Sequence, residues 1–157
     1  MASSATRNLT LSLAGLDGQI GYLLRRAQLT AFAHFNESLR SVKLTPGKFS
    51  VLLLIHENPG AAQSSICATL DILKSHLVAV IKELERRKLV QRTPHTKDAR
   101  ANELRLTALG KKVLKKAVAL NNAHEEKLHG QFSKSEQKRL MADLKRLAQI
   151  EITRRQF

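Results

Sequence analysis

The sequence has a single cysteine and no long apolar run. Because Cys67 has no second cysteine to pair with, an internal disulfide and a multi-cysteine zinc site are both excluded. The longest aliphatic run extends from Val51 to Ile55, far short of the roughly 20 residues that a membrane helix needs. The stretch from Met1 to Thr10 is polar and lacks the apolar segment of a signal peptide. These absences predict a protein of the reducing cytoplasm with no membrane partner.

Acidic residues are also scarce. The chain of 157 residues has 13 of them against 27 lysines and arginines, which gives a net charge of +14 and an isoelectric point near 10.5. Such an excess of positive charge predicts a polyanionic partner. Hydrophobic residues make up 43% of the chain, which is enough for the core of one ordinary domain.

Motifs of catalysis and of metal binding are missing. Gly47-Lys48 lacks the glycine five positions earlier that a phosphate-binding loop requires. No Gly-x-Ser-x-Gly motif occurs, and no serine or cysteine has a convincing catalytic partner. His124 and His129 are five positions apart, a spacing that does not share a helix face well. We therefore predict that the chain is not an enzyme and that it binds neither a metal nor a cofactor.

Apolar residues recur at helical spacing from about Leu16 to Leu39. Tyr22, Leu29 and Phe32 lie off the main stripe, so this helix is apolar on two sides. Both sides have to be buried, and a second chain is a candidate partner for one of them. The main stripe contains Ile20, Leu23, Leu24, Ala27, Ala31, Phe35 and Leu39.

Three further helices are predicted between positions 45 and 87. Thr45-Pro46 is typical of an N-cap followed by proline in the first helical position, and Pro59-Gly60 ends that helix. A break near Asp71-Ile72 separates the second helix from the third. The three helices contain Phe49 to Glu57, Gln63 to Leu70, and Lys74 to Arg87. The stripe of the third that faces inward is Leu77, Val80, Ile81 and Leu84.

The period of the apolar residues then changes from 3.6 to 2. This change predicts two short strands, Leu89 to Arg92 and Glu103 to Leu106. Between them, the polar stretch from Thr93 to Asn102 contains Pro94 and is too unpatterned for a helix. We predict a hairpin with a long, charged tip.

Two helices are predicted after the hairpin. Thr107 caps the first, which extends to Gly130. Ser133 and Glu136 fit a capping box that opens the second. The apolar residues of this last helix that we expect to face inward are Leu140, Met141, Leu144, Leu147 and Ala148.

This order of elements predicts a mostly α fold, a winged helix-turn-helix of six helices plus a β-hairpin wing, with N- and C-terminal helices that form a dimer. Residues 45–106 form the DNA-binding lobe in this interpretation. Residues 16–44 and 107–157 form the helical dimerisation region, and residues 1–15 are a flexible N-terminus.

A winged helix-turn-helix places its second helix in the major groove, so the outer face of that helix has to be small or polar. Lys74, Ser75 and His76 supply such a face. The hairpin tip, with His95, Lys97 and Arg100, can reach the minor groove or phosphates. From Leu73 to Thr107 there are nine lysines and arginines against four acidic residues. The alternative is a basic helix face that is merely solvated.

The segment that ends the third of these helices and begins the hairpin resembles the MarR family of bacterial transcriptional regulators. That family has leucine-glutamate, an arginine and glycine-leucine-valine, then a wing with aspartate-x-arginine, and leucine-threonine at the next helix. The matching residues here are Leu84-Glu85-Arg86-Arg87-Lys88-Leu89-Val90, Asp98-Ala99-Arg100 and Leu106-Thr107. The resemblance covers nearly the whole chain, from Leu23-Leu24-Arg25-Arg26 to the last helix.

The resemblance implies an obligate homodimer that places two recognition helices and two wings on one face of double-stranded DNA. Ser75 and His76 then take base-contacting positions, Lys74 a phosphate-contacting one, and Arg100 the minor-groove position of the wing. Asp98 matches the aspartate that braces that arginine, and Lys97 belongs to the same wing. The chain departs from the family at Val78 and Ala79, where a polar or basic residue is common, and at Lys88, which replaces the glycine of the turn.

The resemblance also implies a small-molecule site between the dimer-forming helices and the DNA-binding lobe. The candidates on these segments are Tyr22, Arg26, His34, Phe35 and Phe49. Each has an alternative role in the core, on the surface or in an interface. The positive charge suits a carboxylate or a coenzyme A thioester as the ligand.

We therefore predict a homodimeric repressor that binds a pseudo-palindromic operator and is released by a small carboxylated, aromatic or acyl-CoA effector. One alternative is an architectural protein that binds DNA without sequence specificity. Another is a redox-sensing regulator that acts through Cys67, which is otherwise a small core residue.

Overall fold

The structure is a computed structural model that describes residues 12–94 and 102–148. Six α-helices and a two-stranded antiparallel sheet form these described residues, as the sequence predicted. In chain order the elements are the 3-10 turn η1 (Leu16–Gly18), α1 (Ile20–Leu39), the 3-10 turn η2 (Arg40–Val42), α2 (Pro46–Glu57), α3 (Gln63–Leu70), α4 (Lys74–Arg86), β1 (Val90–Pro94), β2 (Asn102–Leu106), α5 (Ala108–His129) and α6 (Lys134–Ala148).

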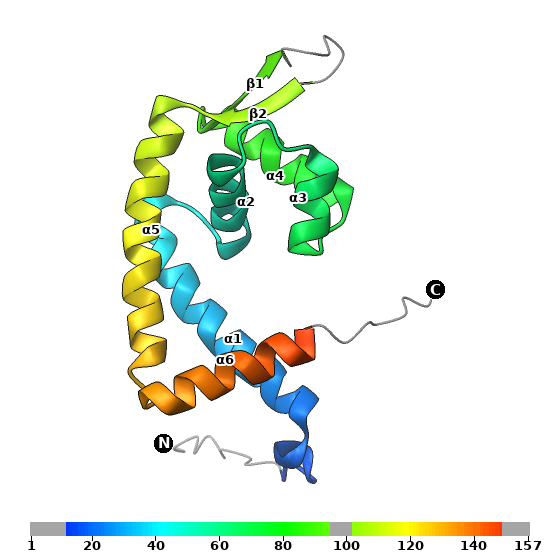
Figure 1. The fold of residues 1–157 in the computed structure, drawn as a ribbon, viewed down its shortest axis with the longest axis vertical. Helices are drawn as coiled ribbons and strands as arrows, with labels where there is room; N and C mark the ends of the chain where they lie inside the picture. Colours follow the sequence, from blue (N-terminus) through cyan, green and yellow to red (C-terminus); the bar gives the residue numbers. More distant parts are fainter. Residues whose placement is uncertain (1–11, 95–101, 149–157) are drawn as a thin grey trace, which may run out of the picture.

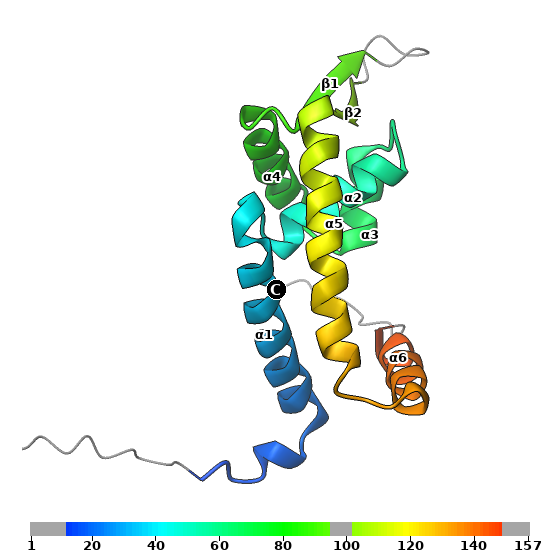
Figure 2. The same ribbon diagram turned by 90° about the vertical axis from the view of Figure 1, so that its left-hand side faces the viewer.

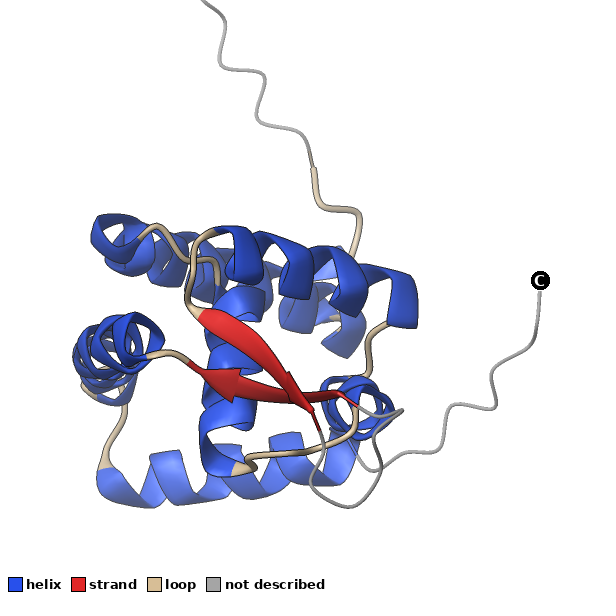
Figure 3. Cartoon of the chain, turned by 90° about the horizontal axis from the view of Figure 1, so that it is seen from above, coloured by secondary structure: helices blue, strands red, loops and turns tan. Residues whose placement is uncertain are grey.

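The helices form a compact lobe and a long stalk. Figure 1 shows α2, α3 and α4 gathered beneath the hairpin, while α1 and α5 extend away from this lobe. Figure 2 shows α1 and α5 side by side along much of their length, and α6 turning back from the end of α5. Seen from above in Figure 3, the two strands lie over the helices at one end of the molecule. Within the described residues no single helix is long and apolar enough to cross a bilayer, although α3 and α4 pass that test as a pair bent by 113°.

Side-chain caps begin α2, α5 and α6 at the positions that the sequence predicted. The Thr45 side chain accepts a hydrogen bond from the Lys48 backbone N–H at 3.4 Å, and Pro46 follows as the first residue of α2. Thr107 accepts from the backbone N–H of Gly110 at 2.9 Å and begins α5. Before α6, the Ser133 backbone N–H donates to the Glu136 carboxylate at 2.8 Å, which completes the predicted capping box.

The core lies in the lobe, where α2, α4 and the hairpin meet. All four residues of the predicted inward stripe of α4 are buried. Figure 1 shows α2 between α4 and α5, which explains why an almost uniformly apolar helix is accommodated there. The largest fully buried side chains are Leu39, Val51, Leu52, Ile55, Leu77, Ile81, Leu84, Leu89 and Leu104.

The first strand differs from the prediction at both ends. It begins at Val90 rather than Leu89, because the Leu89 backbone N–H donates to the carbonyl of Leu84 at 2.9 Å and so closes the end of α4. It also continues through Thr93 to Pro94, which pair with Glu103 and Asn102. A two-stranded sheet tolerates a proline because one side of every strand is an edge.

The long N-terminal helix begins later than predicted. Gln19 is extended and separates η1 from α1, so the continuous helix starts at Ile20 rather than Leu16. The helix α4 ends one residue earlier than predicted, at Arg86, and Arg87 belongs to the following turn. Most of the predicted flexible N-terminus lies outside the described residues.

The apolar face of α6 is not turned into this chain, so the prediction that it faces inward is wrong for the single chain. No residue of α6 is buried, because the helix lies beyond the lobe at the far end of α5. Its four largest apolar side chains are between 37% and 50% exposed. The first half of the α1 stripe, namely Ile20, Leu23 and Leu24, is also exposed in the single chain.

Candidate functional site

The first turn of α4 presents the polar side chains that the sequence predicted there. Lys74, Ser75 and His76 are exposed, whereas Leu77 is fully buried beneath them. Ala79, one turn further along, is exposed as well, and Val78 is half-buried. The outer face at the start of α4 is therefore short, basic and polar.

The turn between α3 and α4 has helix-turn-helix geometry. Asp71 ends α3 in the left-handed conformation (φ 49°), and the Ile72 backbone N–H donates to the carbonyl of Cys67 at 3.1 Å. The two helices meet at a bend of 113°, within the range of about 90–120° that is usual for this motif. The bend directs the start of α4 away from the core.

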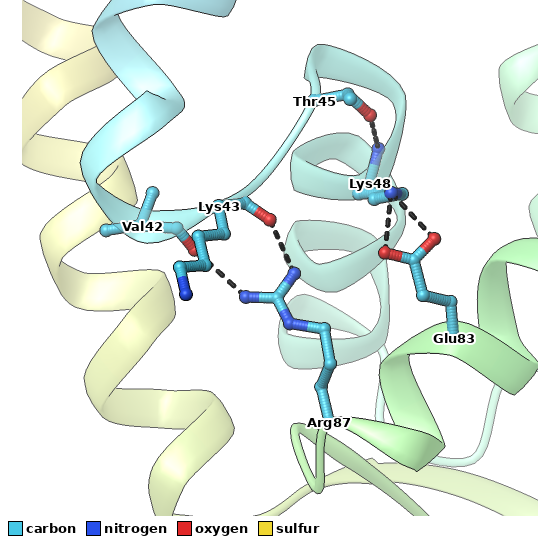
Figure 4. A network of polar contacts seen from close by, with 6 residues as sticks. All are labelled: Val42, Lys43, Thr45, Lys48, Glu83 and Arg87. Atoms are coloured by element: carbon cyan, nitrogen blue, oxygen red, sulfur yellow. Dashed lines mark hydrogen bonds and ion pairs between the residues drawn. The ribbon is translucent and has the colours of Figure 1, made fainter.

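A polar network fixes the orientation of α4 relative to the rest of the chain (Figure 4). The Lys48 ammonium group contacts both carboxylate oxygens of Glu83 at 2.7 Å, and this hydrogen bond lowers the pKa of the Glu83 carboxyl. The Arg87 guanidinium donates to the backbone carbonyls of Val42 at 2.9 Å and Lys43 at 2.5 Å. Since Val42 and Lys43 end the turn η2 that follows α1, Arg87 connects the C-terminal end of α4 to the end of the stalk helix α1.

One ion pair joins the hairpin to α4, and a second lies within β2. Arg92 contacts Glu85 of α4 at 2.7 Å, and Arg105 contacts Glu103 at 2.6 Å. The hairpin tip, residues 95–101, lies outside the described residues. The predicted contacts of Lys97, Asp98 and Arg100 with DNA therefore remain predictions.

A cluster of aromatic rings joins α1, α2 and α5 where the stalk meets the lobe. Phe35 stacks on His124 with ring centroids 4.8 Å apart, and its edge meets Phe49 at 5.6 Å. His34 stacks on the other histidine at 4.9 Å, and the Nδ1 atoms of His34 and His124 are 2.7 Å apart. We call these four residues the junction cluster.

The hydrogen bonds of the junction cluster determine how its protons are arranged. Lys127 Nζ lies 3.5 Å from Nε2 of His34, and an ammonium group can only donate, so that nitrogen accepts. His34 Nδ1 then carries the ring hydrogen and donates a hydrogen bond to Nδ1 of His124. Burial lowers the pKa of His124, which is only 3% exposed, and the nearby His34 and Lys127 lower it further while Glu125 opposes them.

Three of the five predicted ligand residues, His34, Phe35 and Phe49, belong to this cluster. Arg26 is exposed and Tyr22 half-buried on the same helix. A rise of 1.5 Å per residue places Arg26 about 12 Å along α1 from His34, so these two remain predictions. The sequence interpretation considered His124 only as a metal ligand and missed it as a member of this cluster. It lies seven positions after Ala117 on the inward stripe of α5, and that spacing was the available signal.

In the described part of the chain, neither the single cysteine nor a metal-binding cluster suggests a second site. Cys67 is half-buried and packs against the core of the lobe, which agrees with its interpretation as a small core residue. Among the described residues, no three His, Cys, Asp or Glu side chains lie close enough together to hold a metal ion.

Comparison with known proteins points to one family. The profile of the MarR family matches residues 44–101. A protein of Thauera aromatica, described as a putative transcriptional regulatory protein for the hcr operon, is 30% identical over 131 residues, which make up 83% of this chain and 79% of that protein. This similarity extends well beyond the lobe that the family profile matches.

Solved structures of a transcriptional repressor, CouR, have the same fold. CouR bound to a 23-mer DNA duplex has a TM-score of 0.83 and is 38% identical, and the match covers 88% of this chain and 99% of that one. CouR bound to p-coumaroyl-CoA has a TM-score of 0.83 and is 37% identical, with 90% and 99% covered.

Proposed function

The chain belongs to the MarR family of transcriptional regulators, and from this membership we propose that it is a ligand-responsive repressor. In this proposal a homodimer binds a pseudo-palindromic operator, and a small aromatic carboxylate or its coenzyme A thioester releases it. DNA is the polyanion that its charge of +14 predicts.

The first turn of α4 is the observation that carries the proposal. A short, exposed, basic face at the start of the second helix of a helix-turn-helix is what entry into the major groove requires. Lys74 suits a phosphate, whereas Ser75 and His76 can donate to or accept from base edges. The similar repressor CouR has been solved on a DNA duplex, which supports the same role for this lobe.

The exposed apolar side chains of α1 and α6 support the homodimer. Large apolar side chains that one chain leaves exposed on two helices are typical of a subunit interface. The first half of α1 and all of α6 lie at the far end of the stalk from the lobe, so pairing these ends leaves both recognition helices free. The exposed apolar side chains are Ile20, Leu23, Leu24, Leu29 and Phe32 on α1, and Leu140, Met141, Leu144 and Leu147 on α6. Leu13 and Leu16, which precede α1, and Phe132, which precedes α6, are exposed as well.

The junction cluster is our candidate for the part of the effector site that contacts an aromatic ring. Aromatic ligands stack on aromatic side chains, and the structure of CouR with p-coumaroyl-CoA gives a relative that binds an aromatic thioester. Arg26 is the candidate partner of a carboxylate because its guanidinium can bond both oxygens.

The position of the cluster suggests how a ligand would release DNA. The cluster lies between α1 and α5, and Arg87 connects the end of α4 to the residues that follow α1. A ligand that separated α1 from α5 would change the spacing of the two recognition helices in a dimer. DNA accepts only spacings near one helical turn, so such a state binds the operator weakly.

Calorimetry tests the proposal. Aromatic acids and their coenzyme A thioesters, p-coumaroyl-CoA included, are titrated into the free protein and into its complex with a duplex selected from a random pool. A true effector binds the complex about 5- to 150-fold more weakly, since coupling between two sites is reciprocal. A ligand that binds both forms equally would contradict release by that ligand.

A further inference from the structure

Leu73 occupies the N-cap position of α4, where a polar side chain is usual. Its backbone is extended (φ −67°, ψ 144°), and no side chain caps the first turn of the helix. A serine, threonine, asparagine or aspartate there would satisfy one of the unpaired backbone N–H groups, which leucine cannot do. Helix stability alone therefore does not account for leucine at this position.

Packing does not account for it either. With 71% of its surface exposed, Leu73 is the most exposed large apolar side chain in the described part of the chain. The neighbouring Ile72 is half-buried and Leu77 is fully buried, so the core of the lobe is completed by other residues. Among the described residues, nothing covers most of the apolar surface of Leu73.

The residues around Leu73 indicate which kind of molecule covers its apolar surface. Lys74, Ser75 and His76 follow it directly and are exposed, which makes this a polar and basic surface with one apolar side chain at its tip. In the major groove the apolar group at the edge of a base pair is the 5-methyl group of thymine. The combination of basic neighbours and an exposed leucine fits DNA better than an apolar protein surface.

We propose that Leu73 is a specificity-determining residue that contacts the 5-methyl group of a thymine in each operator half-site. This inference rests on the proposed function, since it requires α4 to enter the major groove. Burial of one methyl group against a leucine favours thymine over uracil by about fourfold in each half-site.

Uracil substitution tests the contact directly, because uracil lacks only the methyl group. A duplex is first selected from a random pool with the unmodified protein. Each thymine is then replaced by uracil in turn, and the Kd is measured for the unmodified protein and for Leu73→Ser and Leu73→Ala. Leu73→Ser can cap α4, so its melting temperature should not fall. Leu109→Ala is the matched control, an exposed leucine at the start of α5.

We expect one position in each half-site at which uracil weakens binding of the unmodified protein and of Leu109→Ala by about fourfold. Both Leu73 variants should bind the thymine and uracil duplexes equally at that position. Equal losses in all four proteins, or no loss at any thymine, would overturn the assignment. If no duplex is enriched from the pool, the proposed function fails before Leu73 is tested.

Discussion

Lys88 has a backbone φ of 56°, in the left-handed region that favours glycine. It follows α4 in the turn that leads to the hairpin. The Lys88 backbone N–H donates to the carbonyl of Glu85 at 2.8 Å, and the Leu89 N–H donates to that of Leu84 at 2.9 Å. The turn therefore keeps its closed geometry although lysine replaces the glycine that is usual in the family. The cost appears as backbone strain at one residue.

Replacement of Lys88 by glycine should stabilise the protein by up to about 1.6 kcal/mol. Relief of the left-handed strain gains about 1–2 kcal/mol, while the greater freedom of glycine in the unfolded chain costs about 0.4–1 kcal/mol. Urea unfolding of Lys88→Gly and Lys88→Ala measures the difference. Alanine removes the same charge but keeps the Cβ atom, so an alanine variant as stable as the glycine variant would show that strain is not the cause.

The candidate sites were predictable from sequence only where the residues lie on one helix. Ser75 and His76 could be placed because the buried face of α4 follows from its apolar spacing. Contact between His34 and His124, which are 90 positions apart, depends on how α1 crosses α5. No local pattern contains that information, so His124 was missed while its partner was named.

Among the elements, α2, α5 and α6 could be predicted because side-chain caps mark where they begin. Thr45, Thr107 and Ser133 each have a side chain that caps a first turn. The ends of β1 were less predictable. Pro94 disfavours a strand, yet pairing with the second strand holds it in one, and this tertiary contact outweighs the local preference.

The packing of α5 on the turn between α4 and β1 depends on Gly110. A Cβ atom at this position would lie 1.9 Å from the backbone carbonyl oxygen of Leu89. Gly110→Ala should therefore destabilise the protein by about 3 kcal/mol or more, at the upper end for overpacked sites. Thermal or urea unfolding measures the loss.

Gly47→Ala provides the control, because nothing lies within 4 Å of a Cβ atom there. Alanine in a helix is favoured over glycine by roughly 0.5–1 kcal/mol, so this variant should be no less stable than the parent. A Gly110→Ala variant as stable as the Gly47→Ala variant would contradict the close packing of α5.

The junction between α1 and α5 should weaken in acid. The folded protein lowers the pKa of His124 below its ordinary value of 6.5, chiefly through burial. The unfolded chain therefore binds the proton more readily, and stability that is complete above pH 6.5 is lost as the pH falls below this value. The loss ends once the pH has fallen below the pKa of the folded form.

Urea unfolding at a series of pH values between about 5 and 8 measures this dependence. His124→Gln removes the titrating group and should make the free energy of unfolding depend less on pH. His129→Gln is the control because His129 is exposed on the same helix. An unchanged slope in His124→Gln, or an equal change in both variants, would contradict the assignment to His124.

At the scale of the whole molecule, one chain leaves an apolar surface that a second copy can cover. The sequence predicted apolar faces on α1 and α6 from their spacing, but the direction in which they point could not follow from one chain's pattern. In the proposed dimer these faces meet, and the lobes with their basic α4 helices lie at the opposite ends of the stalks.

Leu144→Glu should dissociate the proposed dimer. The leucine is 43% exposed in the single chain, so a symmetric interface loses the burial of that remaining surface twice, which costs about 1–3 kcal/mol. Two buried carboxylates without partners add several kcal/mol, so dimerisation should weaken at least about 100-fold. Light scattering at micromolar concentration should find a monomer. Lys145→Gln alters the net charge by the same amount on the same helix and should leave a dimer. A dimeric Leu144→Glu protein would exclude this face from the interface.

The ratio of two DNA affinities decides whether the protein is an operator-specific repressor. A net charge of +14 binds any duplex, so affinity alone does not separate a repressor from an architectural protein. Fluorescence anisotropy at one fixed salt concentration near 150 mM should compare a duplex selected by the protein with a scrambled duplex of the same composition. An operator-specific repressor should bind the selected duplex at least about 10³-fold more tightly. A ratio close to one would contradict it and favour an architectural DNA-binding protein.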